Sequence, residues 1–252
     1  MIILLTSSRT IARFDAARQT WIAHLSAMKS IDLDQKCLYS SIRCLEYFEC
    51  CLNISNGKSA KLIIVSDEAD PQRGIVTLLE LHGKMNYLDA QHRQLKMIKH
   101  LIKFDRRLVA HIRWVALTDD DTWLNVNQIL AVLSMLDWQK PMAVGHILTE
   151  QESTKDLLYA SGGAGIFLSI SAFSIIASRL YTYCPFCKYN DLTVGVCLAS
   201  SGIERVHVPS FVAFRPAELT FEVLTNVASI HYMTPQDMIN ATKILNLEQR
   251  QI

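Results

Sequence analysis

The sequence predicts an α/β protein with a mostly parallel central sheet that helices flank. Short apolar runs, rich in aliphatic and β-branched residues, are typical of strands buried on both faces of a sheet. Such runs occupy residues 2–5, 62–65 and 114–117, and amphipathic stretches lie between them. Strands that alternate with helices favour a parallel arrangement. We find no internal repeat, low-complexity tract or linker, so a single domain over residues 1–252 is expected.

The helical stretches follow the strands along the chain. In residues 12–27, Phe14, Ala17, Trp21 and Leu25 recur at helical spacing. Further helices are predicted over residues 92–109, 125–136 and 171–181, from Asn190 and after Pro235, with a short strand over residues 143–147. In sheets of this kind, ligands bind beyond the carboxyl ends of the strands. That edge should carry the polar residues that follow the first three predicted strands.

Composition excludes some classes of protein. Half of the residues are hydrophobic, so a sizeable core is expected. The net charge of +1 argues against binding to the phosphate backbone of nucleic acids. No apolar run reaches the roughly 18 residues of a membrane-spanning helix. The apolar start at Met1 leads directly into Thr6 and Ser7, with no basic leader and no cleavage pattern, and indicates a core strand instead of a signal peptide.

Three consecutive acids follow the strand predicted at residues 114–117. The carboxylates of Asp119, Asp120 and Asp121 repel one another, so a fold that gathers them at a strand end needs a compensating cation. Mn²⁺ or Mg²⁺ bridging to a diphosphate fits, because such ions prefer oxygen ligands. The alternative is that Asp121 caps a helix starting near Trp123 while the other two acids are solvated.

The cysteines near the end of the chain indicate an oxidising compartment. Cys184 and Cys187 have the CxxC spacing, but a zinc site needs a second ligand pair, and only Cys197 follows at short range. A disulfide from Cys184 or Cys187 to Cys197 is therefore favoured if the compartment is oxidising. Asn53 and Asn240 begin triplets that match the N-glycosylation pattern. Together these features point to the lumen of the secretory pathway.

Three motifs occur in order: Asp-Asp-Asp-Thr-Trp at 119–123, Ser-Gly-Gly-Ala-Gly at 161–165 and Asn-Asp-Leu-Thr-Val-Gly at 190–195. Their order and spacing resemble the fringe-like branch of the β1,3-glycosyltransferases, which includes fringe, the core 1 galactosyltransferase and the glucosyltransferase that extends O-linked fucose. Further matches lie at Thr6-Ser7, Arg18-Gln-Thr-Trp21, Val65-Ser-Asp67, the Arg93/Lys99 pair and residues 228–232. Residues 30–61 do not align with the family.

This resemblance implies a GT-A fold, a Rossmann-like α/β arrangement, with one nucleotide-sugar site and a divalent metal. The implied activity is an inverting transfer of a hexose or N-acetylhexosamine from a UDP-sugar to a hydroxyl of a glycan or glycoprotein, forming a β1,3 linkage. Family members carry an N-terminal membrane anchor and stem. This chain begins at the first strand of the catalytic domain, so we expect the anchor to be missing and the location to be the Golgi or ER lumen.

The resemblance also suggests roles for individual residues. Asp121 is the best candidate for direct metal coordination, with Asp119 or Asp120 acting through water or on the nucleotide ribose. The pocket for the nucleotide sugar is expected to include Thr6, Arg18, Asp67, Arg93, Lys99, Asp119, Asp120 and the loop of Gly162, Gly163, Ala164 and Gly165. In the loop, side chains would collide with the substrates. Arg93 and Lys99 could instead be ordinary solvated helix charges, and Arg18 could pair with a local acid.

Asp191 matches the carboxylate that the family uses as general base, although it could also serve only as a helix cap. The chain departs from the family at two positions. Asn190 replaces a second acid, and Val212 replaces a histidine that commonly completes the metal shell. His207 or His231 could take that place, and we expect the metal set Asp119, Asp121 and His231. The alternative function is a catalytically weak or inactive relative that binds glycoproteins or assists the folding of an active enzyme.

Overall fold

A computed structural model describes residues 1–24, 50–54, 58–70, 72–73, 75–76, 86–104, 112–151 and 156–248. Its central sheet has the strand order β11-β7-β10-β5-β1-β3-β2, with β4 paired to β3. The bounds of these strands are β1 (Ile2–Leu5), β2 (Cys50–Ile54), β3 (Lys58–Val65), β4 (Ile75–Val76), β5 (Trp114–Asp119), β7 (Met142–Gly145), β10 (Ile166–Ser169) and β11 (Glu204–His207).

The sheet is mostly parallel, as predicted. Strand β1 runs parallel to both β3 and β5, β4 runs parallel to β3, and β11 runs parallel to β7. Strand β10 is antiparallel to β5 and to β7 and joins the two parallel parts, while β2 pairs antiparallel with β3 at the edge. The predicted fold class is therefore confirmed, and the arrangement is consistent with the GT-A fold.

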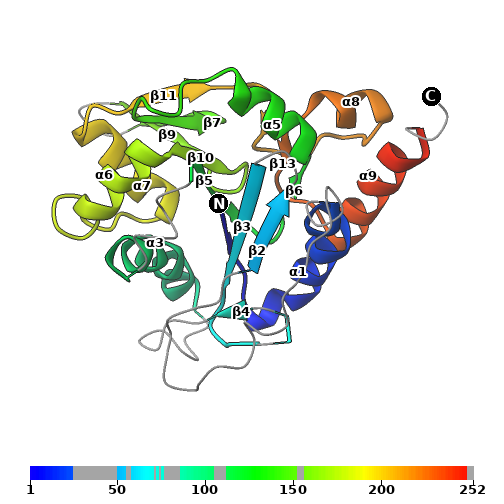
Figure 1. Cartoon of the computed structure of the whole chain (residues 1–252), viewed down its shortest axis with the longest axis horizontal. Coiled ribbons are helices and arrows are strands. Elements are labelled where there is room, and N and C mark those ends of the chain that lie inside the picture. Colours follow the sequence, from blue (N-terminus) through cyan, green and yellow to red (C-terminus); the bar gives the residue numbers. More distant parts are fainter. Residues whose placement is uncertain are drawn as a thin grey trace.

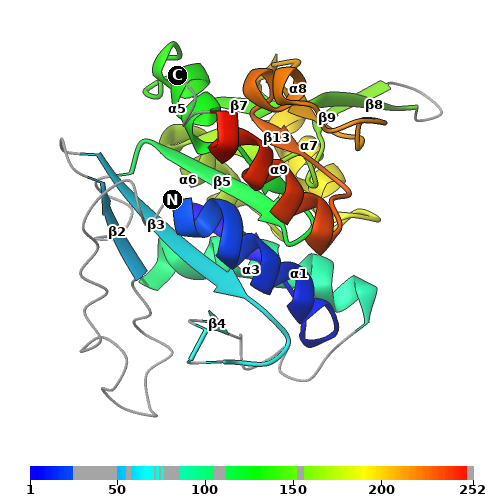
Figure 2. The ribbon, with the colours of Figure 1, turned by 90° about the vertical axis from the view of Figure 1, so that its right-hand side faces the viewer.

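Helices cover both faces of the sheet (Figure 1). Helices α3, α6 and α7 pack together on one face, and α1, α5, α8 and α9 lie on the other (Figure 2). The bounds are η1 (Ser8–Thr10), α1 (Ile11–Ala17), the π-helical turn η2 (Arg18–Ile22), α3 (Tyr87–Phe104), α5 (Val126–Ser134), α6 (Ile170–Arg179), α7 (Asn190–Ser200), α8 (Phe221–Asn226) and α9 (Pro235–Glu248). Among the described residues, no helix combines the length and apolar character needed to cross a bilayer.

The predicted helices and strands differ from the structure mainly at their ends. The first helix begins at Ile11 and is described to residue 24, and α3 begins at Tyr87 instead of residue 92. Residues 25–27 and 105–109 of these predictions lie outside the described part. The strand predicted at 143–147 is present as β7, Met142–Gly145, but it ends earlier than predicted because the chain leaves the sheet at His146. The last residue of the prediction, Ile147, starts β8 (Ile147–Gln151), which pairs with β9 (Asp156–Ala160).

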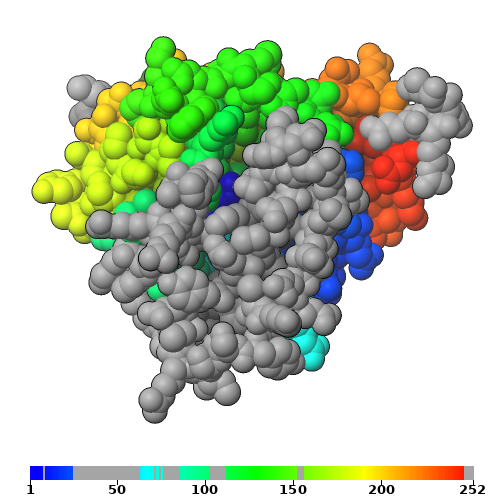
Figure 3. All heavy atoms as spheres, in the orientation of Figure 1, coloured from blue at the N-terminus to red at the C-terminus, as the bar shows by residue number. Residues whose placement is uncertain are grey.

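Two apolar cores lie on opposite faces of the sheet. Neighbouring side chains of a strand point to opposite faces, so Ile3 enters the core beside α3 and α6 while Leu4 enters the core beside α1 and α9. Both side chains are fully buried. Each such burial stabilises the fold by roughly 1.5–3 kcal/mol. Helices α1 and α9, which both contribute to the core of Leu4, lie side by side at the surface, in blue and red in Figure 3.

The strand register aligns the ends of three strands. Leu5 of β1 is level with Val65 of β3 and with Asp119 of β5. The residues that follow, Thr6 and Ser66 among them, therefore leave the sheet at one edge together with the three aspartates. Ligands of parallel α/β sheets bind beyond this edge.

A second, small sheet lies beside this edge. Strand β13 (Ser229–Ile230) pairs with β12 (Phe211–Val212) and with β6 (Trp123–Leu124), which follows the aspartates directly. This pairing brings residue 231 next to the aspartates. The side chain of Trp123 is buried in the core beside α9, and its indole donates to Thr242 Oγ1 at 3.1 Å.

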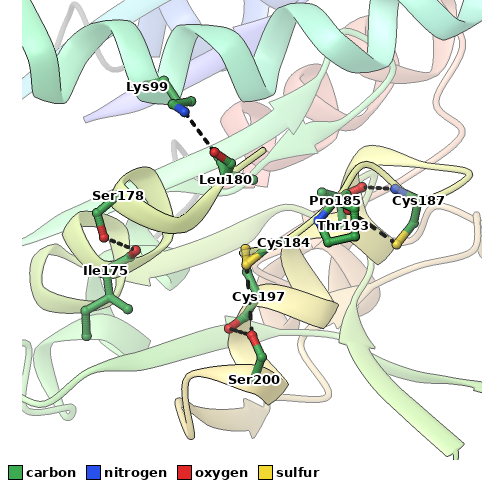
Figure 4. Close-up of a disulfide and its surroundings, with 10 residues drawn as sticks. All are labelled: Lys99, Ile175, Ser178, Leu180, Cys184, Pro185, Cys187, Thr193, Cys197 and Ser200. Atoms are coloured by element: carbon green, nitrogen blue, oxygen red, sulfur yellow. Dashed lines mark hydrogen bonds between the residues drawn. A yellow bond between two sulfur atoms is a disulfide. The ribbon is translucent and has the colours of Figure 1, made fainter. Parts of the chain in front are cut away.

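A disulfide fastens helix α7 to the loop that precedes it. Cys184 is bonded to Cys197, with the Cα atoms 5.3 Å apart (Figure 4). The expected pairing of Cys197 with one of the two CxxC cysteines is therefore confirmed, and Cys184 is the partner. Cys187 lies outside the bond, with its Sγ 3.8 Å from the carbonyl oxygen of Pro185.

Removing this bond should destabilise the protein. Replacement of both Cys184 and Cys197 by Ala should lower the free energy of unfolding by about 2–4 kcal/mol, because the unfolded chain regains the freedom of the closed loop. Urea unfolding under non-reducing conditions measures the difference. Cys187→Ala is the matched control, since that cysteine shares the loop but not the bond. Equal stability of the double variant and the wild type would contradict the stabilising role.

Candidate active site

Two aspartates and a histidine form a possible metal site at the edge of the sheet. Candidate ligand atoms of Asp119, Asp121 and His231 all lie within 4.8 Å of one another. His231 Nε2 is 3.4 Å from Asp121 Oδ1. Asp119 ends β5, Asp121 lies in the turn that follows, and His231 comes directly after β13. The structure therefore gathers the three residues that the sequence analysis named as metal ligands.

His207, the other histidine considered for this role, lies elsewhere. Its Nδ1 accepts a hydrogen bond from the amide of Ile147 at 3.1 Å, and its ring packs edge-on against His146. Val212 contributes through its backbone, because its carbonyl oxygen accepts from the His231 amide at 3.0 Å. The imidazole Nδ1 of His231 faces the carbonyl oxygen of Ala213 at 3.3 Å, which assigns the proton to Nδ1 and leaves Nε2 facing Asp121.

The electrostatics of this cluster fit a divalent cation. Burial, followed by the charge of Asp121, raises the pKa of Asp119 to about 7. For His231, burial lowers the pKa, but the hydrogen bond and charge of Asp121 outweigh it and the net pKa is raised. The charge of Asp121 contributes to both shifts, so the potential between these side chains is negative and favours a bound cation. Two carboxylates and an imidazole are a donor set that Mn²⁺ accepts, so these residues fit the expected metal.

Asp120 accepts hydrogen bonds from two threonine side chains in the segment between β1 and α1. Its Oδ2 accepts hydrogen bonds from Thr6 Oγ1 at 2.7 Å and from Thr10 Oγ1 at 2.5 Å. Burial raises its pKa to about 6, although the two hydroxyl groups oppose the shift. Arg13 Nη1 lies 4.0 Å from Asp120 Oδ1 and 3.5 Å from Asp121 Oδ2. Asp120 therefore ties the start of the first helix to the aspartate turn.

Sequence analysis missed Thr10 and Arg13, although a signal was present. A helix that follows a strand of a parallel sheet starts at the carboxyl edge, so the first turns after Thr6 had to lie near the aspartates. Thr10 follows Thr6 by one helical turn, and Arg13 follows Arg9 at the same spacing. Arg13 places a positive charge 3.5 Å from Asp121, a role that the sequence analysis assigned to no residue of this segment.

The glycine loop lies between the aspartate turn, β13 and α7. A Cβ atom at Gly163 would lie 2.0 Å from the imidazole carbon Cε1 of His231, so the histidine ring occupies the space that a side chain would need. Gly165 has a φ of +90°, which disfavours other residues. Thr122 Oγ1 donates to the carbonyl oxygen of Gly163 at 2.7 Å, and Ser229 Oγ donates to that of Ala164 at 2.5 Å. The need for these glycines is thus explained within the protein, and contact with substrates stays a prediction.

Asp191 joins this loop to helix α7. Its Oδ2 accepts from the Gly162 amide at 3.2 Å and its Oδ1 accepts from the Leu192 amide at 2.8 Å. Burial raises its pKa more than these hydrogen bonds lower it. The N-cap position of α7 is Tyr189, so Asp191 lies within the first turn of the helix, where it still accepts from a backbone amide of that turn. Its role as general base stays a prediction. Its half-buried carboxylate faces the loop that carries the His231 ring.

Asn190 faces helix α3. Its Nδ2 donates to Gln94 Oε1 at 2.7 Å, and its backbone amide donates to Gln91 Oε1 at 3.0 Å. The residue that stands in place of the family's second acid therefore anchors the start of α7. Likewise, the helix predicted to be capped by Asp121 is capped by Asn125, whose side chain accepts from the Gln128 amide. The cap alternative for Asp121 is thus wrong.

The remaining predicted residues have different surroundings. Arg93 and Asp67 are both fully buried, and the charge of Asp67 acts on Arg93, whose pKa burial lowers. The alternative that Arg93 is an ordinary solvated charge on a helix is therefore wrong. Lys99 donates from Nζ to the carbonyl oxygen of Leu180 at 2.8 Å, which places it at the contact of α3 with the end of α6 (Figure 4). Arg18 is exposed on η2. The nucleotide-binding roles of these four residues stay predictions.

A sequence profile of the Fringe-like family matches residues 59–250. The chain is 26% identical over 133 residues to a human β-1,3-glucosyltransferase, a match that covers 52% of this chain and 26% of that protein. A mouse β-1,3-glucosyltransferase is 26% identical over 125 residues, covering 48% of this chain and 25% of that protein. The matched region spans about a quarter of the length of these relatives. A solved glycosyltransferase involved in the glycosylation of the major capsid of PBCV-1 is 12% identical, with a TM-score of 0.47 over 96% of this chain and 98% of that one.

The chain therefore belongs to the Fringe-like family. The profile includes all three motifs, from the aspartate turn through the glycine loop to the start of α7. The resemblance stated from these motifs is confirmed.

The pairing of Asp121 with His231 can be measured directly. Asp121→Asn removes the charge that raises the pKa of His231, so that pKa should fall, and the pKa of Asp119 should fall with it. NMR titration of the His231 imidazole in metal-free protein measures the change. Asp237→Asn is the matched control, because that carboxylate binds Arg215 instead. An unchanged His231 pKa in Asp121→Asn would contradict the pairing.

Proposed function

We propose that this chain is an inverting, divalent-metal-dependent glycosyltransferase. It moves a hexose or N-acetylhexosamine from a UDP-sugar to a glycan hydroxyl and forms a β1,3 linkage. The observation that supports this most is the placement of Asp191 against the same loop that seats His231 of the metal cluster. Family membership and the names of the two relatives support the type of linkage.

Asp119, Asp121 and His231 would hold the metal ion. When bound, Mn²⁺ or Mg²⁺ supplies positive charge that stabilises the diphosphate leaving group. Arg13 adds a permanent positive charge beside Asp121. Thr6, Asp67, Arg93 and Asp120 would line the nucleotide pocket from the same edge of the sheet. This assignment is supported by the strand register, since Thr6 and Asp120 contact each other there.

Asp191 would act as the general base. An inverting transfer needs one base that takes the proton of the acceptor hydroxyl as this attacks the anomeric carbon opposite the leaving group. Burial raises the pKa of Asp191 above its ordinary value, which makes the carboxylate a stronger base. The amides of Gly162 and Leu192 hold the carboxylate in a defined orientation, and the N-terminus of α7 favours its charged form.

The proposed acceptor is a glycan or glycoprotein, and the proposed location is the Golgi or ER lumen. The disulfide between Cys184 and Cys197 supports an oxidising compartment. Asn240, the start of one glycosylation triplet, has an exposed position on α9.

Calorimetric titration of UDP-sugars tests the proposal. UDP-glucose, UDP-galactose and UDP-N-acetylglucosamine are titrated with and without Mn²⁺. We expect binding that requires the metal, because the acidic cluster alone repels a diphosphate. Asp121→Asn should abolish the metal-dependent binding, and Asp237→Asn is its matched control. The absence of any nucleotide binding in the presence of Mn²⁺ would overturn the proposal and favour a glycoprotein-binding or chaperone-type partner.

Asp191→Asn should separate binding from turnover. We expect kcat to fall by about 10²- to 10⁴-fold, because the base is lost, while metal-dependent UDP affinity is retained. In the wild type, the active form carries ionised Asp191, so activity should fall as the pH drops through its raised pKa. UDP release measures both effects. Glu204→Gln is a control carboxylate at the exposed start of β11. Unchanged kcat in Asp191→Asn would exclude this residue as the base.

A further inference from the structure

Four tyrosines from separate segments gather around Asp191. Tyr87 begins α3, Tyr159 lies in β9, Tyr189 occupies the N-cap position of α7, and Tyr232 follows β13 and His231. The rings of Tyr87 and Tyr189 meet edge to face, with centroids 6.2 Å apart and an angle of 78°. Tyr189 precedes Asp191 by two residues, so this pair flanks the proposed base.

Tyr159 packs on the face of α7 that carries Asp191. A Cβ atom at Gly195 would lie 2.6 Å from the Cβ atom of Tyr159, so the glycine makes room for the tyrosine. Gly195 follows Asp191 by one helical turn and therefore lies on the same face of the helix. The glycine that ends the third motif thus has a structural purpose, which is to admit Tyr159 beside the base.

Tyr232 has an unusual backbone and an exposed ring. Its φ is +59°, a left-handed conformation that a bulky residue adopts only at a cost. The flanking amides of His231 and Met233 bind the carbonyl oxygens of Val212 and Asp121, so the chain must turn sharply here. A glycine would make this turn without strain. The tyrosine is instead 56% exposed, and its ring stacks on the His231 imidazole with centroids 3.7 Å apart. Strain at an exposed side chain beside a site indicates that the side chain has a use.

Burial and nearby charges raise the pKa values of two of these tyrosines. Burial raises the pKa of Tyr87, and the charges of Asp119 and Asp191 raise it further. Burial also raises the pKa of Tyr159, followed by the charges of Asp191 and Glu150. Both hydroxyl groups therefore stay protonated and can donate hydrogen bonds to a ligand beside the proposed base.

We propose that Tyr87, Tyr159, Tyr189 and Tyr232 form the acceptor subsite and bind a neutral saccharide. Phenol rings offer flat apolar faces to the C–H groups of a sugar and hydroxyl groups to its polar edge. Charges of both signs lie beside these phenols, since Asp191 and Glu150 act on Tyr159 and Lys188 Nζ lies 4.8 Å from the ring centroid of Tyr189. This balance suits an uncharged polyhydroxyl ligand. The sugar hydroxyl nearest Asp191 is the one that gives up its proton. This inference rests on the proposed function, because it takes Asp191 as the base.

Saturation-transfer NMR with methyl glycosides of fucose, galactose, glucose and N-acetylglucosamine tests the subsite, in the presence of Mn²⁺ and UDP. We expect at least one glycoside to bind the wild type. Tyr232→Gly should weaken that binding about tenfold while the free energy of unfolding is kept or raised, since glycine relieves the backbone strain. Tyr87→Ala should weaken it similarly, whereas Tyr232→Phe, which keeps the ring, should retain most of it. Tyr183→Ala is the matched control, because this tyrosine is equally exposed and stacks on Arg179.

The outcomes separate the subsite from the proposed function. If UDP binds with Mn²⁺ but no glycoside gives a signal, or if Tyr232→Gly and Tyr87→Ala bind the glycoside as the wild type does, the subsite is wrong and the transferase proposal stands. If neither the wild type nor any variant binds UDP, the transferase proposal fails instead. Weakened UDP binding in Tyr232→Gly, equal to the weakened glycoside binding, would assign this tyrosine to the donor pocket and overturn the inference.

Discussion

The close fit of the His231 ring over the backbone of Gly163 organises this site. Because a Cβ atom would occupy the same space, the ring can rest on the loop only where the loop has no side chain. That contact limits where the imidazole can lie relative to the aspartate turn. The same loop then receives hydrogen bonds from Thr122 and Ser229 and gives one to Asp191. The glycine loop therefore contacts both His231, a possible metal ligand, and Asp191, the proposed base.

The central sheet and the small sheet each position part of the candidate site. In the central sheet, the register of β1 with β3 and β5 delivers Thr6, Asp67 and the aspartates to one edge. In the small sheet, β13 pairs with β6, which continues directly from the aspartates, and so carries a residue from 110 positions farther along the chain to Asp121. Neither sheet alone would complete the cluster. Two buried cores and a disulfide hold the surrounding helices in place.

Much of the fold could be predicted from sequence, because buried parallel strands and amphipathic helices leave strong local patterns. The strand at Ile2–Leu5 and the aspartates after β5 are such cases. Contacts made by pairing across the chain leave no local pattern. The antiparallel direction of β10, the choice of His231 over His207 and the hydrogen bond of Thr10 to Asp120 depend on register and on which segments meet. The sequence analysis considered both His207 and His231 and expected His231 in the metal set, and the structure places His231 beside the aspartates while His207 lies elsewhere.

The contact of Asn190 with α3 limits which side chains position 190 can hold. Gln94 Oε1 accepts a hydrogen bond from the side-chain amide of Asn190, and Gln94 Nε2 donates one to the carbonyl oxygen of Thr118. An aspartate at position 190 would present only acceptors, so the Gln94 amide would have to turn around and face the Thr118 carbonyl with its own oxygen. The substitution Asn190→Asp alone would therefore leave two buried oxygen atoms facing each other, either at position 190 or at Thr118. The side chains at positions 94 and 190 thus depend on each other chemically.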